Sequence, residues 1–369
     1  MFYFHHNTHL FIQAAMSSSF DPYNVILSSV DFAEVVCWVQ NSGNDYNCML
    51  GARISSIFVI FAVSTAVAFF PVIAKRVPRL KIPLYVYLFA RYFGTSVIIA
   101  TAFVHLLDPA YSEIGPNSCV GMTGHRAEYS WPPAIVLTST VVVFLMDFGA
   151  ELYVEAKYGI QNEPMLDIVQ ETHIHRASEE GQTTSLKTKQ DSTWDTQDFS
   201  DSAAAERSFR QQIAALLILE FGVIFHSVII DLNLGVVGSE FTTLYPVLVF
   251  HQSFEGLGIG ARMSAIPFKR SSWLPWILCM LYGLTTPISI AIGLGLRTTY
   301  DPNSNTANIV SGLLDSISAG ILIYTGLVEL LARDFLTDPC RTNNKKRLAF
   351  MTACTVLGAG IMALIGKWA

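Results

Sequence analysis

The chain has 369 residues, of which 51% are hydrophobic and only 14% are charged. Soluble domains carry about 25% charged residues, so this composition argues against a soluble enzyme and against a disordered chain. The net charge of −6 also argues against the basic surface that a nucleic-acid-binding protein needs. The apolar excess predicts that most of the chain faces a lipid bilayer.

The first 50 residues precede the first long apolar stretch, and we expect them to form an extracellular N-terminal segment. Cys37, Cys48 and, further along the chain, Cys119 are all expected on the same outer side. An oxidising space permits disulfides, so one bridge among these three cysteines is expected. Their order in the chain does not say which two are joined.

Eight mostly apolar stretches are long enough to cross a bilayer as helices, which takes about 20 residues. Strands of a membrane barrel would be about half as long and would alternate. The sequence therefore predicts an all-α polytopic membrane protein, with spans one to three in 51–153, a polar loop in 154–210 and spans four to eight in 211–369. The eight predicted spans are Ile54–Ala74, Leu84–Leu107, Pro132–Tyr153, Gln211–Gly235, Phe241–Arg262, Trp273–Leu296, Thr306–Leu330 and Leu348–Trp368.

The distribution of Lys and Arg predicts the orientation, because cytosolic loops of membrane proteins carry an excess of both. With the N-terminus placed outside, the inner segments hold 17 of these residues and the outer segments hold 4. Every inner loop contributes to the excess. We therefore expect both termini to be extracellular.

The loop between spans three and four is rich in Ser, Thr and charged residues, so it cannot bury a core and is expected to be disordered and cytosolic. It contains His173 and His175 in the run Thr172-His173-Ile174-His175. Two interpretations stay open for this pair. The histidines are either solvated side chains or a weak, transient site for a metal leaving the protein.

Span five carries ionisable residues, which are costly in hydrocarbon and hence candidates for function. His251 and Glu255 are four residues apart and share one helix face, and Gln252 lies beside them. Imidazole and carboxylate together suit Zn²⁺ or a similar divalent metal. The structural alternative is a hydrogen bond between helices.

Span four carries two neighbouring polar stripes at about 100° per residue. His226 and Asn233 form one stripe, whereas Glu220, Ser227 and Asp231 form the other. Two stripes along one membrane helix favour a lined path for an ion, and the alternative is a structural polar seam. His226, His251 and Glu255 would supply three strong ligands, and the absence of thiolates in this set argues against a tight structural zinc site.

Other spans supply weaker candidates. His105 and Asp108, at the outer end of span two, are either an entrance site or simply mark the helix end. Asp147 and Glu151, at the inner end of span three, are either an exit site or interfacial charges.

Span seven also contains two acidic residues, Asp315 and Glu329. Asp315 is expected to be a satisfied hydrogen-bond partner of a neighbouring helix. Glu329 is expected to be hydrated near the inner boundary.

The motifs of spans four and five together resemble the ZIP (Zrt-, Irt-like) divalent metal transporters. They read Phe225-His226-Ser227 leading to Leu234-Gly235, and His251-Gln252-Ser253-Phe254-Glu255-Gly256. Runs in spans one, two and seven fit as well, and the fungal plasma-membrane zinc-uptake members are the most similar. The resemblance covers residues 50–369.

The resemblance implies a bundle in which spans one to three and six to eight are inverted repeats around spans four and five. It implies uptake of Zn²⁺ toward the cytosol, and it places the transport site on His226, His251 and Glu255, with Ser227 and Gln252 adjoining. The chain departs from the family pattern at Asp231, where members usually have Gly. Asp231 is therefore expected to hold a second ion, with Asn233 and Glu220 as further candidates, or to bias the choice of metal. The alternative is that it contacts a neighbouring helix without affecting metal.

The prediction is therefore a plasma-membrane importer that transports Zn²⁺, has no resident cofactor and is not an enzyme. Fe²⁺ or Mn²⁺ transport is the near alternative, because nitrogen-plus-carboxylate sites discriminate poorly among such ions. An intramembrane zinc hydrolase and a metal-gated receptor are more distant alternatives. No nucleic-acid partner is expected, and a homodimer stays open.

Overall fold

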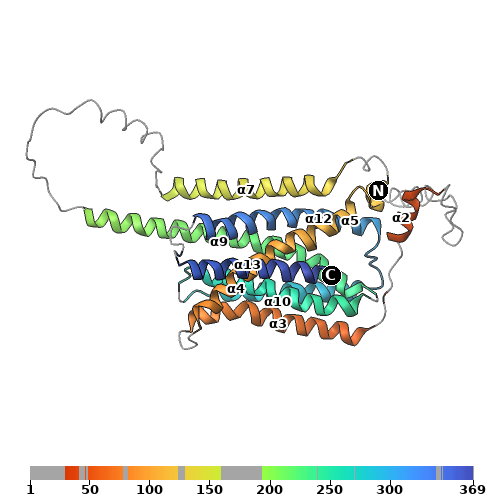
Figure 1. The fold of residues 1–369 in the computed structure, drawn as a ribbon, viewed down its shortest axis with the longest axis horizontal. Coiled ribbons are helices and arrows are strands. Elements are labelled where there is room, and N and C mark those ends of the chain that lie inside the picture. Colours follow the sequence, from red (N-terminus) through yellow and green to blue (C-terminus); the bar gives the residue numbers. More distant parts are fainter. Residues whose placement is uncertain are drawn as a thin grey trace, which may run out of the picture.

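The computed structural model describes residues 30–40, 46, 49–77, 82–123, 129–158, 193–238, 240–269, 271–337, 342 and 344–368. Within these residues all regular secondary structure is helical, and long helices lie side by side along one direction (Figure 1). The helices, in chain order, are α2 (Phe32–Gln40), α3 (Leu50–Arg76), α4 (Leu84–Thr101), η2 (Ala102–Leu107), α5 (Asp108–Ile114), α6 (Cys119–Met122), α7 (Trp131–Tyr158), α9 (Thr193–Val236), α10 (Phe241–Ala265), α11 (Leu274–Leu296), α12 (Asn305–Tyr324), η4 (Thr325–Thr337), α13 (Lys345–Ile365) and η5 (Gly366–Trp368).

Each of the eight predicted spans corresponds to a helix. In the described part of the chain, seven helices are long and apolar enough to cross a membrane. The helix outside that set is α10, whose hydropathy is lowered by the polar residues that include His251, Gln252 and Glu255. Helix α9 begins at Thr193, within the stretch that the sequence predicts as loop. His173 and His175 lie outside the described residues.

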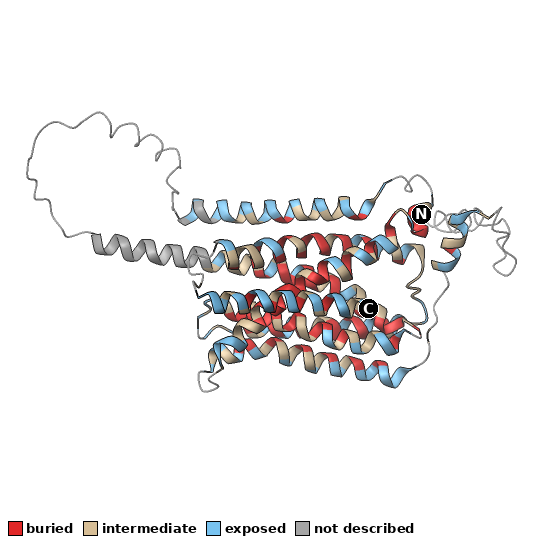
Figure 2. Cartoon of the chain, in the orientation of Figure 1, coloured by how far each residue is buried: buried red, intermediate tan, exposed pale blue. Residues whose placement is uncertain are grey.

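The burial pattern is that of a membrane bundle. The most buried residues gather in the middle of the bundle, whereas α7 is largely exposed (Figure 2). Its exposed side chains are apolar, for example Leu137, Leu145 and Met146. Because apolar exposure of this kind is unfavourable in water, the pattern agrees with a helix that faces lipid.

Helix α10 is held tightly between α3 and α4 by small residues. A Cβ atom on Gly258 would lie 2.8 Å from the backbone of Gly94 on α4, and one on Gly260 would lie 2.1 Å from the backbone of Ala68 on α3. Membrane helices pack through such small residues because lipid gives no hydrophobic drive to association. The close packing fixes the position of the polar side chains on α10.

Two segments of the bundle are π-helical, a form that often occurs at functional sites. The segment η2 interrupts span two between α4 and α5 and carries His105. The segment η4 continues α12 and carries Glu329 and Asp334. Each of these residues lines one of the cavities described below.

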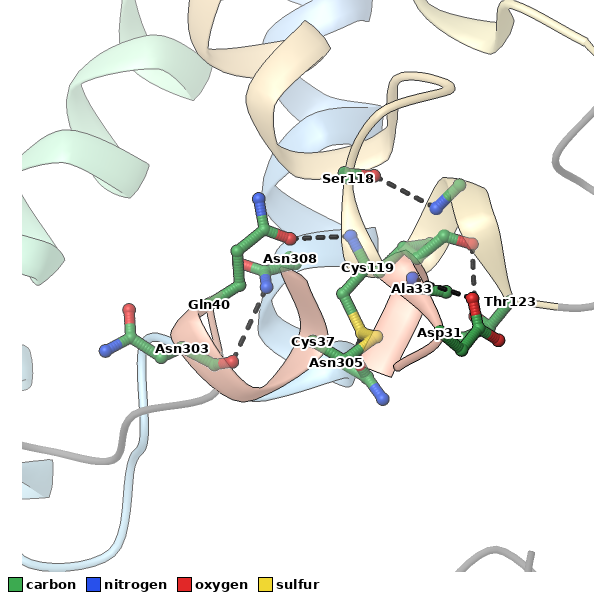
Figure 3. The surroundings of a disulfide bond; sticks show 12 residues. Asp31, Ala33, Cys37, Gln40, Ser118, Cys119, Thr123, Asn303, Asn305 and Asn308 are labelled. Atoms are coloured by element: carbon green, nitrogen blue, oxygen red, sulfur yellow. Dashed lines mark hydrogen bonds between the residues drawn. A yellow bond between two sulfur atoms is a disulfide. The ribbon is translucent and has the colours of Figure 1, made fainter. Parts of the chain in front are cut away.

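One end of the bundle is closed by a disulfide between Cys37 of α2 and Cys119 of α6 (Figure 3). The Gln40 side chain strengthens the junction, because its oxygen accepts the Cys119 backbone N–H at 2.6 Å and its nitrogen donates to the Ser112 carbonyl at 3.2 Å. The expectation of one disulfide among the outer cysteines is confirmed. Cys48, the third candidate, lies outside the described residues.

Candidate metal centre

Three side chains from α9 and α10 meet in the middle of the bundle. His226, His251 and Glu255 each offer a ligand atom, and these atoms lie within 4.8 Å of one another. All three side chains are buried. In the part of the chain that the structure describes, this is the one group of at least three His, Cys, Asp or Glu with such spacing.

The distances within this group fit a tetrahedral zinc ion. The Nε2 atoms of His226 and His251 are 3.3 Å apart, and His251 Nε2 is 3.4 Å from Oε1 of Glu255. Zinc binds nitrogen and carboxylate oxygen at about 2.0–2.2 Å, so two ligands of a tetrahedral ion are about 3.3–3.6 Å apart. Two of the three separations therefore match the spacing that zinc requires, and the third is at most 4.8 Å.

Several polar atoms of these three side chains lack hydrogen bonds. Neither carboxylate oxygen of Glu255, nor Nδ1 of His226 or His251, has a hydrogen bond to the described residues. The Thr101 hydroxyl on α4 faces the Glu255 carboxyl group. A buried carboxylate without a partner is costly, so this group needs a cation or a proton.

Ser227 and Gln252, which follow His226 and His251 in the chain, contact each other. The Gln252 amide nitrogen donates to the Ser227 hydroxyl at 3.4 Å. The amide oxygen of Gln252 accepts a hydrogen bond from the Tyr282 hydroxyl of α11 at 3.0 Å, and the Gln252 carbonyl accepts one at 2.9 Å. Tyr282 thus orients Gln252, a role that nothing in the spacing of the sequence indicates.

His105 lies against the metal centre. Its ring packs edge to face on the ring of His251, with the centroids 5.0 Å apart. The His105 ring lies beside the backbone of Met362, and its Nε2 atom has no hydrogen bond to the described residues. Span two could therefore supply a fourth ligand, either the imidazole nitrogen of His105 or an oxygen atom.

A cavity of about 250 Å³ leads from His251 toward the end of the bundle that carries the disulfide. We call it the acidic cavity, because its described lining includes four acidic residues and no Lys or Arg. The polar residues in its wall are His105, Asp108, Glu113, Asn233, Glu240, His251, Ser311 and Asp315.

A second cavity, of about 520 Å³, lies at the opposite end of α9 and α10. We call it the arginine cavity, because Arg91, Arg262 and Arg333 line it together with Glu329 and Asp334. A buried apolar cluster that includes Leu219, Val223, Ile259 and Met263 lies between this cavity and the metal centre. Of the three ligands, His251 lines the acidic cavity, and none lines the arginine cavity.

The carboxylates of the arginine cavity are paired. Arg91 donates to both oxygens of Asp334, at 2.9 and 2.6 Å, and Arg262 approaches the same carboxylate at 3.4 Å. Arg333 pairs with Glu329 at 2.5 Å. Glu329 is 9% exposed and lines this cavity, and its hydration stays a prediction.

The other predicted site residues are distributed as follows. Glu220 and Asp231 are buried on α9 with carboxylate oxygens that have no hydrogen bond to the described residues, and the Thr286 hydroxyl faces Asp231. Asp147 accepts a hydrogen bond from the Tyr324 hydroxyl at 2.9 Å, and Glu151 accepts one from the Gln211 amide at 3.3 Å. Asp147 and Glu151 do not belong to the described lining of the arginine cavity.

Comparison with known proteins identifies close relatives along almost the whole chain. The profile of the family described as ZIP Zinc transporter matches residues 50–366. The chain is 54% identical to zinc-regulated transporter 1 of Saccharomyces cerevisiae over 95% of this chain and 97% of that protein. It is 38% identical to zinc-regulated transporter 1 of Schizosaccharomyces pombe, over 89% of this chain and 88% of that protein. It is also 31% identical to zinc transporter 5 of rice, over 91% of this chain and 92% of that protein. No solved structure matches the chain.

Proposed function

The chain belongs to the ZIP zinc transporter family, and from that premise we propose that it imports Zn²⁺ into the cytosol through His226, His251 and Glu255. Its fungal relatives are named as zinc-regulated transporters. Members of this family are transporters and not enzymes, so the hydrolase alternative is set aside.

The observation that carries the site assignment is the spacing of three buried ligand atoms. Their separations of 3.3 and 3.4 Å match two edges of a zinc coordination tetrahedron. The absence of a thiolate from this group of described residues favours a site that releases its ion, as conduction requires. Ser227 and Gln252 adjoin the group and can supply weaker oxygen ligands.

We propose eight membrane spans, with α10 as the fifth. Helix α10 can cross the bilayer despite its polar residues, because its neighbours α3 and α4 cover it. The packing pattern supports the inverted repeat: α10 packs on α3 and α4 as α9 packs on α11 and α12, and α13 packs on α4 as α7 packs on α12. Each contact of one repeat is thus matched in the other, if α3, α4 and α7 correspond to α11, α12 and α13, and α9 corresponds to α10.

Two independent features support an orientation with the acidic cavity outside. The Lys and Arg excess predicts that the connections at the other end are cytosolic. The disulfide between Cys37 and Cys119 lies at the end that the acidic cavity faces, and disulfides persist in oxidising spaces. A plasma-membrane location follows from the resemblance to fungal uptake proteins, and the homodimer stays an open alternative.

The proposed path starts in the acidic cavity at Asp108, passes His105 and reaches the three-ligand centre. Glu220 lies six residues before His226, about 9 Å along the helix, and would be the next carboxylate on the way to the arginine cavity. Release requires that the apolar cluster around Val223 opens, as in the movement of one repeat against the other. Asp147, Glu151, His173 and His175 remain predicted exit residues.

Zinc is the proposed substrate, and nothing in the relatives reported above favours Fe²⁺ or Mn²⁺. Asp231 is the residue that could alter this preference. It is buried, and its carboxyl group interacts electrostatically with that of Glu255. A competition series of Zn²⁺ uptake against Fe²⁺ and Mn²⁺, repeated with Asp231→Gly, tests this role. An unchanged order of competition would remove Asp231 from metal choice.

The central experiment is uptake of radiolabelled zinc in cells that lack their own importer. We expect uptake by the wild type and its loss in His251→Ala, with equal amounts of both proteins at the cell surface. Ser253→Ala is the matched control, because Ser253 lies on the same helix and its hydroxyl donates to the Val249 carbonyl. Absence of uptake by the wild type, or full uptake by His251→Ala, would contradict the proposed function.

A further inference from the structure

The acidic cavity contains a second group of ligand-type side chains that the three-residue centre does not use. Glu113 lies at the end of α5, and Ser311 and Asp315 lie on α12. Ser311 and Asp315 are four residues apart, so they share one helix face. All three line the cavity.

The backbones of α5 and α12 approach closely at this point. A Cβ atom on Gly312 would lie 2.8 Å from the Ile114 side chain and 3.2 Å from Cβ of Glu113. Because glycine occupies that position, Glu113 and Asp315 are brought to the same part of the wall. The Ser311 hydroxyl faces the Glu113 carboxyl group.

The carboxylates of this group lack the partners that a purely structural role would need. Asp315 is only 2% exposed, and its Oδ1 atom has no hydrogen bond to any described residue. Oε2 of Glu113 is also without a hydrogen bond in the described part of the chain. The prediction that Asp315 is a satisfied partner of a neighbouring helix is therefore wrong for Oδ1.

No positive side chain compensates these charges. The charged group that acts on Asp315 is Glu113, which is itself negative. The described lining of the cavity contains no Lys or Arg. Two acids that share a buried wall without a base require a bound cation or a proton.

We propose that Glu113, Asp315 and Ser311 form a second divalent-cation site, composed only of oxygen ligands, that receives the incoming ion before it reaches His251. This inference rests on the proposed function and adds a capture step to it. Oxygen ligands with bound water suit hard cations and exchange them readily. The site would therefore hold zinc more weakly than the imidazole centre and pass it on through the same cavity.

Zinc uptake kinetics test the site in cells. For Asp315→Asn and Glu113→Gln we expect the KM for zinc to rise about tenfold while the maximal rate stays within about twofold, as the loss of a capture ligand should do. Glu240→Gln is the matched control, because Glu240 lines the same cavity and is exposed. It removes the same charge without touching the proposed ligands, so its KM should change much less.

Binding of radiolabelled zinc to the purified full-length protein gives the direct measurement. A His251→Ala/Glu255→Gln variant should retain one weak class of site, and adding Glu113→Gln should weaken that remaining binding about tenfold. Glu113 is partly exposed, so this variant tests the site even if Asp315→Asn fails to accumulate.

Several outcomes would overturn the inference. An unchanged KM in both variants, an equal rise in Glu240→Gln, or residual binding that does not depend on Glu113 would each exclude a capture site. A shift in the pH dependence of uptake without a change in KM would instead assign the pair to a proton. Failure of the proposed function itself would look different, because the wild type would not transport zinc or His251→Ala would transport it fully.

Discussion

The acidic cavity and the arginine cavity lie at opposite ends of the same helices, and they neutralise their acids in opposite ways. In the arginine cavity, Asp334 is held by Arg91 and Arg262. In the acidic cavity, Asp315 has an oxygen without a hydrogen bond to the described residues, and no Lys or Arg in the described lining compensates it. The acids of one end are thus compensated by arginines, whereas those of the other end need a bound cation or a proton.

This difference indicates how a membrane protein can favour an ion on one side and remain closed on the other. A carboxylate that is already paired with arginine has little further affinity for a divalent ion. The arginines also link α4, α10 and η4 at this end of the bundle. In the proposed orientation, the ion pairs of the arginine cavity would hold the cytosolic end closed, and the acids of the acidic cavity would capture the incoming ion.

The same substitution at the two ends should have the most different effects. Asp334→Asn leaves Arg91 and Arg262 without their partner in a buried place, and breaking such a pair costs about 3–5 kcal/mol. Asp315→Asn removes a buried charge that has no compensating base, so it should not lower stability. Thermal unfolding of the two purified variants in metal-free buffer measures the contrast.

Equal loss of stability in both variants would contradict the comparison, since it would mean that Asp315 is also held by a partner. Arg333→Gln gives an internal scale for the arginine end. Its side chain is 39% exposed, and exposed ion pairs contribute about 0–1 kcal/mol, so it should be milder than Asp334→Asn.

Access from outside should distinguish the cavities next. Val247 lines the acidic cavity and Ala215 lines the arginine cavity, and both are partly buried. A membrane-impermeant thiol reagent added to intact cells should label Val247→Cys and should leave Ala215→Cys at the level of the wild type. Labelling of both variants from outside would show that the apolar cluster does not separate the two cavities.

How far the sequence predicts this arrangement depends on how far apart the interacting residues are along the chain. The helices follow from long apolar runs, and the grouping of His251 with Glu255 follows from their spacing on one helix turn. Contact between His105 and His251 does not follow, because it depends on how η2 packs against α10. The pair of Arg91 and Asp334 is separated by 243 residues, so no local pattern indicates it.

The acids show the same limit. Glu113 is not singled out by its spacing, because it lies beyond the apolar core of span two. Asp315 is conspicuous in the sequence, but its surroundings decide whether it is satisfied, and these come from α5. Asp147 accepts a hydrogen bond from the Tyr324 hydroxyl, 177 residues away in the chain, which no local pattern indicates.

The close packing of α10 against α4 should be sensitive to a single added methyl group. Gly258→Ala would place a Cβ atom 2.8 Å from the Gly94 backbone, so α4 and α10 would have to separate. Such overpacking costs about 1–3 kcal/mol, and zinc uptake should fall because Glu255 lies one turn away. Gly149→Ala on α7 is the control, because no atom lies within 4 Å of its added Cβ in the described structure. If both substitutions leave uptake and stability unchanged, the close packing of α10 does not position the centre.

The smallest effect on transport should come from the disulfide, which lies at the acidic end but away from the ligands. Cys119→Ser frees α2, which packs on α6 and is joined to α6 and α5 by the hydrogen bonds of Gln40. We expect the maximal uptake rate to change by less than about twofold, equivalent to less than about 0.5 kcal/mol, while α2 becomes sensitive to added protease. Cys354→Ala, which removes a buried free thiol on α13, should leave α2 protected. A large loss of uptake with normal surface abundance in Cys119→Ser would mean that the disulfide-linked helix α2 is needed to shape the acidic cavity.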